Sequence, residues 1–389
     1  MARVLMITHM ASMIEQFNRN NIQILLDLGC EVHVAANFIS ESNTMTPEQL
    51  RDFKIELGKR GVIAHQIDFE RGLGSFKANI KVWKQLKQIV SNQVFDLIHC
   101  QSPIGGVFGR LIGHKYNVPV IYTAHGFQFF KRSGIKNWLF FYPIEKALSY
   151  FTRTLITINN EDTQVAKRFS KRMNVVQIPG VGIDYNRFVS ESKSTNMISV
   201  RKQLDIPEDA FVIISVGELS KRKNHAVILN AINQLPDKSN IYYIICGIGA
   251  EKKFLEQLAQ KNNFTKNIKL LGYRKNIPEL YAASDICAFP SLREGLGLAG
   301  IEAMACGLPI VTSNINGILD YSQNGITGFS NSPTDVSGFS KSIKALIQSP
   351  DLVDKMGHHN VLAAEKYDQV NVNKKMYEVY SSILKHNNI

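Results

Sequence analysis

The sequence has few cysteines and no long apolar run. Among its 389 residues, five are cysteines: Cys30, Cys100, Cys246, Cys287 and Cys306. Their number is odd and no two are spaced as Cys-x-x-Cys, so we expect buried free thiols of a reducing compartment rather than disulfides or zinc ligands. No apolar run approaches the roughly 18–20 residues of a membrane span. The first ten residues, MARVLMITHM, lack the apolar core of a signal peptide, so a cytoplasmic protein is expected.

Two motifs that hold cofactors are also missing. Asp-x-Asp, the close pairing of acidic residues that commonly holds Mg²⁺ beside a diphosphate, occurs nowhere in the chain. This favours a reaction without a metal and without a resident cofactor. The first apolar run is not followed by Gly-x-Gly-x-x-Gly, which excludes a dehydrogenase of the common dinucleotide-binding type.

What the sequence does have is an excess of positive charge. The formal net charge is +12, with 44% hydrophobic and 20% charged residues, an ordinary composition for a globular protein. Residues 110–172 hold 11 Lys and Arg against three acidic residues. A basic surface of this kind can attract nucleic acid, anionic lipid or a phosphorylated substrate, and charge alone does not choose among them.

Short apolar runs alternate with amphipathic stretches along most of the chain, which predicts parallel sheets covered by helices. In the first half we expect strands at 3–8, 31–36, 62–67, 95–100, 118–123, 154–158 and 174–178. An amphipathic stretch from Ile14 to Gly29 predicts one helix, and further helices are expected near 46–60, 76–92, 104–116, 137–150 and 161–171.

A Pro/Gly-rich stretch at 178–184 interrupts the pattern, which then restarts. Strands are expected at 211–216, 241–246, 268–271, 286–289 and 310–312, with helices near 224–234, 250–261, 276–283 and 298–306 and only helices from 334 onward. We therefore predict an α/β protein of two doubly wound, Rossmann-like domains, 1–180 and 181–367. A final helix at about 368–389 should pack back on the first domain. Ligands of such sheets bind beyond the carboxyl ends of the strands, which predicts an interdomain cleft.

The most informative segment is 285–309, DICAFPSLREGLGLAGIEAMACGLP. A strand leads into a glycine-bearing loop and a helix, an arrangement that offers free backbone amides to a phosphate. Glu294 and Glu302 flank this loop and helix start. Carboxylates beside a phosphate are explained if they accept hydrogen bonds from the paired hydroxyls of a ribose or hexose. The alternative is one exposed loop glutamate and one surface helix glutamate.

The pattern E-G-x-G-x-x-x-x-E-A-M-A-C-G-x-P resembles the nucleotide-sugar signature of glycosyltransferase family 4, retaining enzymes with the two-domain GT-B fold. TAHGF at 123–127, PGVGID at 179–184 and GELSKRKNH at 217–225 extend the likeness over the whole chain. It is strongest towards the bacterial capsule and exopolysaccharide branch. The resemblance implies metal-independent transfer of a sugar, such as an N-acetylated hexosamine or deoxyhexosamine, from a UDP-sugar to a lipid-linked saccharide.

The resemblance also implies roles for residues of the second domain. Glu294 looks like the carboxylate that binds donor-sugar hydroxyls and acts in catalysis, and Glu302 like the carboxylate that binds the ribose. The backbone amides of Gly295, Leu296 and Gly297 would face the diphosphate or the sugar.

Further roles fall on the segment SVGELSKRKNH and on the loop LGYRKNI. Lys223 matches the family's diphosphate lysine, with Gly217 in the same donor-binding segment. Many members carry arginine where this chain has Glu218, and whether Arg222 compensates is left open. Arg274 matches the region near the nucleobase. A solvated loop lysine and a surface arginine are the alternatives for Lys223 and Arg274.

In the first domain, His125 matches the active-site histidine of the family's T-x-H-G stretch and would orient the donor sugar. A loop histidine satisfied by backbone is the alternative. His9, at the end of the first strand, and Ser12 and Met13, in an expected loop, are placed on the acceptor side. Many members carry two glycines in that loop, and this chain has none there.

The segment FQFFKRSGIKNWLFFYP at 127–143 mixes aromatic and basic residues, which suits peripheral contact with the inner face of the plasma membrane. The alternative is an amphipathic helix packed on its own sheet. Two alternatives remain for the function of the whole chain. One is a nucleotide-sugar epimerase or other non-transferase enzyme on the same fold. The other is a basic nucleic-acid-binding protein, for which no binding motif is present, so no nucleic-acid partner is expected.

Overall fold

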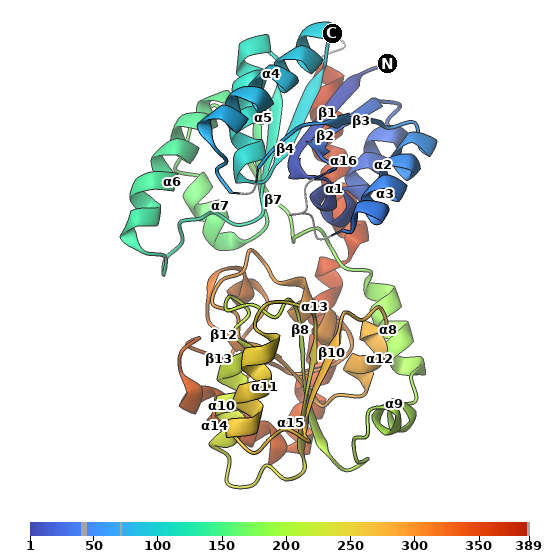
Figure 1. Ribbon diagram of the computed structural model, residues 1–389, viewed down its shortest axis with the longest axis vertical. Coiled ribbons are helices and arrows are strands. Elements are labelled where there is room, and N and C mark those ends of the chain that lie inside the picture. The colour runs from blue at the N-terminus through green and yellow to red at the C-terminus, as the bar shows by residue number, and fades with distance from the viewer. Residues whose placement is uncertain (40–44, 71, 387–389) are drawn as a thin grey trace. The chain divides into compact units, whose positions relative to one another are not determined.

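The computed structural model describes residues 1–39, 45–70 and 72–386, and the chain forms two compact units (Figure 1). Unit 1 comprises Met1–Val181 and the chain from Val370 onward, and unit 2 comprises Gly182–Gln369. Each unit contains one parallel sheet with helices on both faces. The prediction of two Rossmann-like α/β domains is therefore confirmed.

The sheet of unit 1 has seven strands in the order β3-β2-β1-β4-β5-β6-β7. Their bounds are β1 (Arg3–Met10), β2 (Glu31–Asn37), β3 (Ile63–Gln66), β4 (Leu97–Gln101), β5 (Val120–Ala124), β6 (Thr154–Thr157) and β7 (Asn174–Gln177). The helices are α1 (Ala11–Phe17), α2 (Arg19–Asp27), α3 (Pro47–Lys59), α4 (Phe76–Asn92), α5 (Pro103–Tyr116), α6 (Ile135–Leu148) and α7 (Asn160–Ala166). The last helix, α16 (Gln369–His386), is tied to β4, since His99 Nδ1 lies 2.7 Å from the hydroxyl of Tyr380.

The start of unit 1 differs from the prediction in two ways. The expected loop at Ser12 and Met13 is wrong, because β1 runs to Met10 and α1 begins at once at Ala11. The single helix expected from Ile14 to Gly29 is divided at Asn18, whose φ of −127° is not helical. The Asn18 side-chain amide donates to the carbonyl of Met13 at 3.1 Å, which stabilises this break.

The sheet of unit 2 has six parallel strands in the order β10-β9-β8-β11-β12-β13. Their bounds are β8 (Phe211–Val216), β9 (Ile241–Cys246), β10 (Ile268–Gly272), β11 (Ile286–Phe289), β12 (Ile310–Ser313) and β13 (Gly328–Asn331). The helices are α8 (Tyr185–Ser194), α9 (Met197–Gln203), α10 (His225–Asn233), α11 (Lys252–Lys261), α12 (Ile277–Ala282), α13 (Leu298–Ala305), α14 (Val336–Ile347) and α15 (Pro350–Ala364). Strand β13 and helices α8 and α9 were not predicted from the sequence.

The cysteines and the apolar segments behave as their pattern indicates. All five cysteines are free, four of them buried and Cys306 half-buried. Within the described ranges, no helix combines the length and the hydrophobicity that crossing a bilayer requires.

Candidate active site

The strongest cluster of charged side chains in unit 2 lies where β8 and β11 end. The ammonium of Lys223 lies 2.7 Å from Oε1 of Glu294, and the Arg222 guanidinium lies 2.9 Å from the same oxygen. The Ser291 hydroxyl donates to this oxygen as well, at 2.9 Å. Lys223 and Glu294 are each nearly buried, so the sequence alternative of a solvated loop lysine is wrong for Lys223. One carboxylate oxygen thus holds two cations at the carboxyl edge of the sheet.

Backbone and amide contacts fix the two loops that carry this cluster. The Asn224 side-chain amide donates to the carbonyls of Pro290 and Pro333, at 3.1 and 2.8 Å. The backbone amide of Leu292 donates to the carbonyl of Arg222 at 2.8 Å. Because β8 and β11 are neighbours in the sheet, these bonds close the loops after both strands into one rigid edge.

Arg222 is therefore part of the charged cluster around Glu294. It also lies 3.8 Å from Glu218, the residue that stands where many family members have arginine. The chain thus places a guanidinium beside Lys223 and Glu294 although the usual arginine position holds an acid.

Glycines allow close backbone packing around the cluster. Gly217 follows β8, and its carbonyl occupies the place that a side chain at Gly247 would need. Gly297, with φ of 87°, precedes α13 and packs on the ring of Phe289 and on Tyr321. The Tyr321 hydroxyl donates to the Gly297 carbonyl at 3.2 Å. This packing sets the path of the Gly295–Gly297 backbone into the helix.

Glu302 lies on α13, in the turn that follows this loop. Its side chain is half-buried, and burial raises the pKa of the carboxyl to about 7, against the opposing effect of Arg187 and Lys223. Glu302 is therefore only partly ionised near neutral pH, unlike a surface glutamate. Such a carboxyl can bind hydroxyl donors. Glu302 is therefore not the exposed surface glutamate of the alternative interpretation.

Arg274 and its neighbour Tyr273 lie in the loop after β10 and are exposed. Strands β9 and β8 separate β10 from β11, so Arg274 is at the far end of the edge from Glu294. The structure therefore places Arg274 on the same edge as the charged cluster but not within it.

In unit 1, His125 follows β5 and is held by a buried amide network. Its Nε2 lies 2.6 Å from Oε1 of Gln101, so the ring donates its proton there. Gln101 is itself paired with the Asn18 side chain, through Asn18 Nδ2 to Gln101 Oε1 at 3.1 Å and through Gln101 Nε2 to Asn18 Oδ1. Burial lowers the pKa of His125 to about 4, which keeps the imidazole neutral at physiological pH.

The residues predicted for the acceptor side lie beside this network. His9 is the second-last residue of β1, which pairs directly with β4, and burial lowers the pKa of His9. Its Nδ1 is buried, and it has no hydrogen-bond partner among the residues that the structure describes. Ser12 is buried and Met13 half-buried in α1, with the Met13 carbonyl accepting from Asn18.

The aromatic and basic segment 127–143 divides into an inner and an outer part. Phe127 and Phe129 are buried in the core of unit 1, and Trp138 and Tyr142 pack against it. Ile135, Leu139 and Phe140 on α6 are 74%, 71% and 51% exposed. The inner part is therefore packed on the core of unit 1, as the alternative expects, and membrane contact of the exposed outer part stays a prediction.

No metal site is apparent in the described part of the chain, since no group of three or more His, Cys, Asp or Glu residues is suitably arranged. Gln101, Asn18 and Ser291 were not predicted as site residues. Ser291 lies three residues before Glu294 in PSLREG, a spacing at which a turn brings two side chains together. The contact of Asn18 with Gln101, in contrast, joins segments that are 83 residues apart.

Comparisons with known proteins agree for both units. The family described as "Glycosyl transferases group 1" matches residues 197–360, and "Glycosyltransferase Family 4" matches residues 14–180. The chain is 31% identical to the putative glycosyltransferase EpsD of Bacillus subtilis (strain 168), over 92% of this chain and 90% of that protein. It is also 31% identical to the UDP-Gal:alpha-D-GlcNAc-diphosphoundecaprenol alpha-1,3-galactosyltransferase of Escherichia coli, over 70% of this chain and 72% of the relative.

Solved structures share the fold at lower identity. HepE of Anabaena in complex with UDP superimposes with a TM-score of 0.76 at 20% identity, covering 98% of this chain and all of that one. Sucrose-phosphate synthase of Thermosynechococcus elongatus gives a TM-score of 0.79 at 19% identity, covering 99% of this chain and 100% of the other.

Proposed function

This chain belongs to glycosyltransferase family 4, has the GT-B fold and is a glycosyltransferase, and we propose that it moves a sugar from a UDP-sugar to a lipid-linked saccharide with retention of configuration. In this proposal unit 2 binds the donor and unit 1 binds the acceptor. Membership in this family decides against the epimerase and nucleic-acid-binding alternatives.

The observation that carries the proposal is the cluster at Glu294. Breaking a sugar–diphosphate bond leaves negative charge on the diphosphate, which fixed cations stabilise. Lys223 and Arg222 supply two such cations at 2.7 and 2.9 Å from one carboxylate oxygen. The same carboxylate can accept from sugar hydroxyls. The amides of Gly295, Leu296 and Gly297 add donors for the diphosphate or the sugar, and Glu302 accepts from the ribose.

Retention follows if the acceptor hydroxyl enters on the face that the diphosphate leaves. The leaving oxygen then takes the proton, and Lys223 stabilises the departing group. No carboxylate nucleophile is required. His9, Gln101 and His125 lie at the carboxyl edge of the sheet of unit 1. His125 is neutral and already donates its Nε2 proton to Gln101, which suits a role in orienting the sugar.

The proposal includes transfer without a metal, because side chains supply the positive charge that a metal ion would otherwise supply. Activity with the UDP-sugar should then survive an excess of EDTA. Complete loss that Mg²⁺ restores would show that a metal performs the role given to Lys223 and Arg222.

We also assign the outer face of α6 to peripheral membrane contact. The buried pair of Arg110 and Glu145, 2.7 Å apart, ties α6 to α5 and leaves Leu139 and Phe140 outward. Exposed Lys131 and Lys136 flank these apolar side chains, as anionic lipid would favour. Leu139→Asp should weaken sedimentation with phosphatidylglycerol vesicles, whereas Leu362→Asp, at an equally exposed leucine in unit 2, should not.

The acceptor class rests on the named acceptor of the Escherichia coli relative, and the setting, capsule or exopolysaccharide synthesis, on the resemblance. A suitable probe acceptor is N-acetylglucosamine linked through a diphosphate to undecaprenol. The donor sugar would be an N-acetylated hexosamine, a deoxyhexosamine or another hexose.

A donor screen tests the proposal. The melting temperature is measured with UDP-, GDP- and ADP-sugars, and transfer of labelled sugar to the probe acceptor is followed with each stabilising donor. We expect a UDP-sugar to stabilise the protein and to be consumed. If no nucleotide sugar binds or is turned over, the proposed function is wrong.

A further inference from the structure

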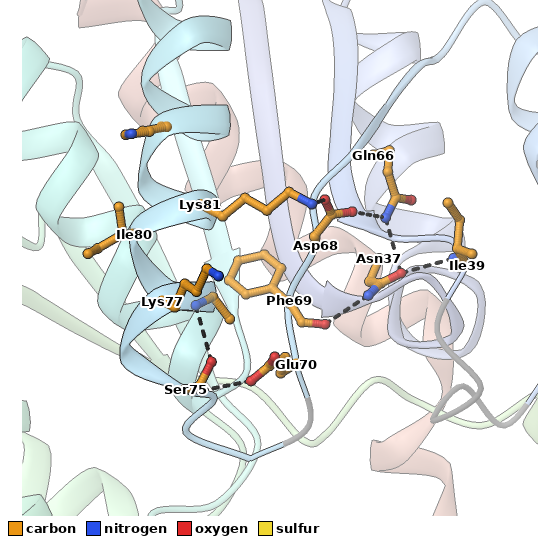
Figure 2. Close-up of a pocket in the computed structure, with 12 residues that line it drawn as sticks. Asn37, Ile39, Gln66, Asp68, Phe69, Glu70, Ser75, Lys77, Ile80 and Lys81 are labelled. Atoms are coloured by element: carbon orange, nitrogen blue, oxygen red, sulfur yellow. Dashed lines mark hydrogen bonds and ion pairs between the residues drawn. The ribbon is translucent and has the colours of Figure 1, made fainter.

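A cavity of about 850 Å³ opens in unit 1 where the loops after β2 and β3 face the first half of α4 (Figure 2). Asn37, Gln66 and Asp68 line one wall, and Lys77, Ile80 and Lys81 of α4 line the other. In the sheet, Asn37 pairs in register with Met10, the last residue of β1. The cavity therefore lies at the same carboxyl edge of the sheet as His9.

Hydrogen bonds hold the strand-side wall rigid. Nε2 of Gln66 donates to Oδ1 of Asn37 at 3.2 Å and to Oδ1 of Asp68 at 2.8 Å. The Asn37 amide donates to the carbonyl of Phe69 at 2.8 Å, and Gln85 of α4 donates to Asp68 at 3.0 Å. These bonds satisfy the amides, so the wall shapes the cavity without leaving amide groups to bind a ligand strongly.

The groups left to bind a ligand are cationic. Lys77, Lys81 and Lys84 lie at spacings of four and three residues, which places them on one face of α4. Lys81 reaches Asp68 at 2.7 Å, as Figure 2 shows. Lys77 and Lys84 form no ion pair with any described residue. The one further carboxylate of the lining, Glu70, accepts from the backbone amide of Ser75 at 2.7 Å. The lining therefore holds three ammonium groups against two carboxylates, and two of the ammonium groups are in no ion pair.

Apolar side chains stand exposed at its rim. Ile39 is 74% and Ile80 42% exposed, and Phe76 lies one helical turn before Ile80 on α4 and is also exposed. Cations or exposed apolar side chains alone would be ordinary surface features. Both around one cavity suit a ligand that combines a negative charge with a hydrocarbon chain.

We propose that this cavity binds the phosphate-bearing head of the lipid-linked acceptor, with Lys77 and Lys84 on the phosphate oxygens and the Ile39–Ile80 rim on the start of the lipid chain. The inference rests on the proposed function and adds the acceptor subsite to it. Glu70 would accept from a saccharide hydroxyl near the phosphate.

Initial rates with the probe acceptor test this subsite at saturating UDP-sugar. Lys84→Glu is compared with Lys87→Glu, the same charge reversal at an exposed lysine three residues along α4 and outside the cavity. We expect Lys84→Glu, and Lys77→Gln combined with Lys84→Gln, to raise the acceptor KM tenfold or more. In these variants the affinity for UDP should stay within twofold of wild type, and the melting temperature should not change. The rates of Lys87→Glu should also stay within twofold of wild type.

Four results would overturn the inference. One is an acceptor KM that Lys84→Glu leaves unchanged, while wild type turns over the probe. Another is an equal effect of Lys87→Glu, which would indicate general surface charge. The third is that Lys84→Glu weakens binding to phosphatidylglycerol vesicles, in the absence of acceptor, as much as it weakens binding of the acceptor. That result would make the cavity a membrane contact. Inorganic pyrophosphate should inhibit weakly; inhibition as strong as probe binding would assign the cavity to a free phosphate compound. Absence of any turnover or UDP binding in wild type would instead refute the proposed function.

Discussion

The ammonium of Lys223 and the carboxylate of Glu294 form an ion pair of 2.7 Å in unit 2. Sequence resemblance gives them different tasks, one at the diphosphate and one at the sugar. Their direct contact means that each fixes the other before the donor arrives. Preorganised charge of this kind requires no rearrangement during reaction, which is what makes such groups effective in catalysis.

Removing Lys223 should reduce turnover strongly. Lys223→Ala removes one stabilising cation, which typically costs about 2.7–4 kcal/mol, or roughly 100- to 1,000-fold in kcat. The matched control is Lys221→Ala, at an exposed lysine two residues earlier. Steady-state rates with saturating UDP-sugar measure both. Equal rates in the two variants would contradict the role of Lys223.

Arg222 offers a separate test of how this chain manages with Glu218 in place of arginine. Because Arg222 contacts the same Glu294 oxygen as Lys223, Arg222→Ala should also lower kcat, by at least tenfold. Arg222→Lys should restore part of the rate, since it keeps the charge but not the planar fork. If Arg222→Ala keeps wild-type kcat, its contact with Glu294 is structural only.

The affinity for UDP should depend on pH through Glu302. Burial raises the pKa of this carboxyl to about 7, and only the ionised form accepts from both ribose hydroxyls. Affinity should therefore rise as pH increases through about 7 and then level off. Calorimetric titration of UDP from pH 6 to 8.5 measures this.

Glu302→Gln provides the control for that pH dependence and an independent stability readout. It should bind UDP more weakly at pH 8 and lose the affinity change that centres near pH 7. Because the folded wild-type protein loses stability when a carboxyl of raised pKa ionises, the variant should have a higher melting temperature than wild type at pH 8. This difference in melting temperature should shrink as pH falls below 7. Wild-type affinity at pH 8 would contradict the ribose assignment.

Much of this arrangement could be predicted from the sequence because it is local. The strand, glycine loop and helix of 285–309 follow one another along the chain, so Glu294 and Glu302 could be assigned to one edge of a sheet. The boundaries of α4 were predicted to the residue, since its apolar face recurs with a helical period.

What could not be predicted depends on contacts between distant segments or on weak local patterns. Strand β13 has the sequence GFSN with a single large apolar residue, and its pairing with β12 defines it. The side chains of Asn18, at the helix break, and of His125 both contact Gln101, which only the sheet brings near. The loop expected at Ser12 failed because glycine is absent there and α1 can start directly.

The buried contact of Gln101 with His125 predicts a change in pH profile. In Gln101→Glu, a carboxylate replaces the amide oxygen and should raise the His125 pKa from about 4 towards neutrality. Wild-type kcat should then show no His125 inflection between pH 5.5 and 8, while the variant shows one. Gln101→Ala should lower kcat and leave the affinity for UDP unchanged. A variant profile that parallels wild type would mean that Gln101 does not act through His125.

The stereochemistry of the product tests the central claim most directly. Retaining transfer from an α-linked UDP-sugar places the acceptor oxygen on the face that the diphosphate leaves, with Lys223 stabilising the leaving group. The anomeric coupling constant of the transferred sugar in the proton NMR spectrum of the product gives the configuration. The account predicts an α-linked product. A β-linked product would contradict it, and it would require a general base, for which His125 would be the first candidate.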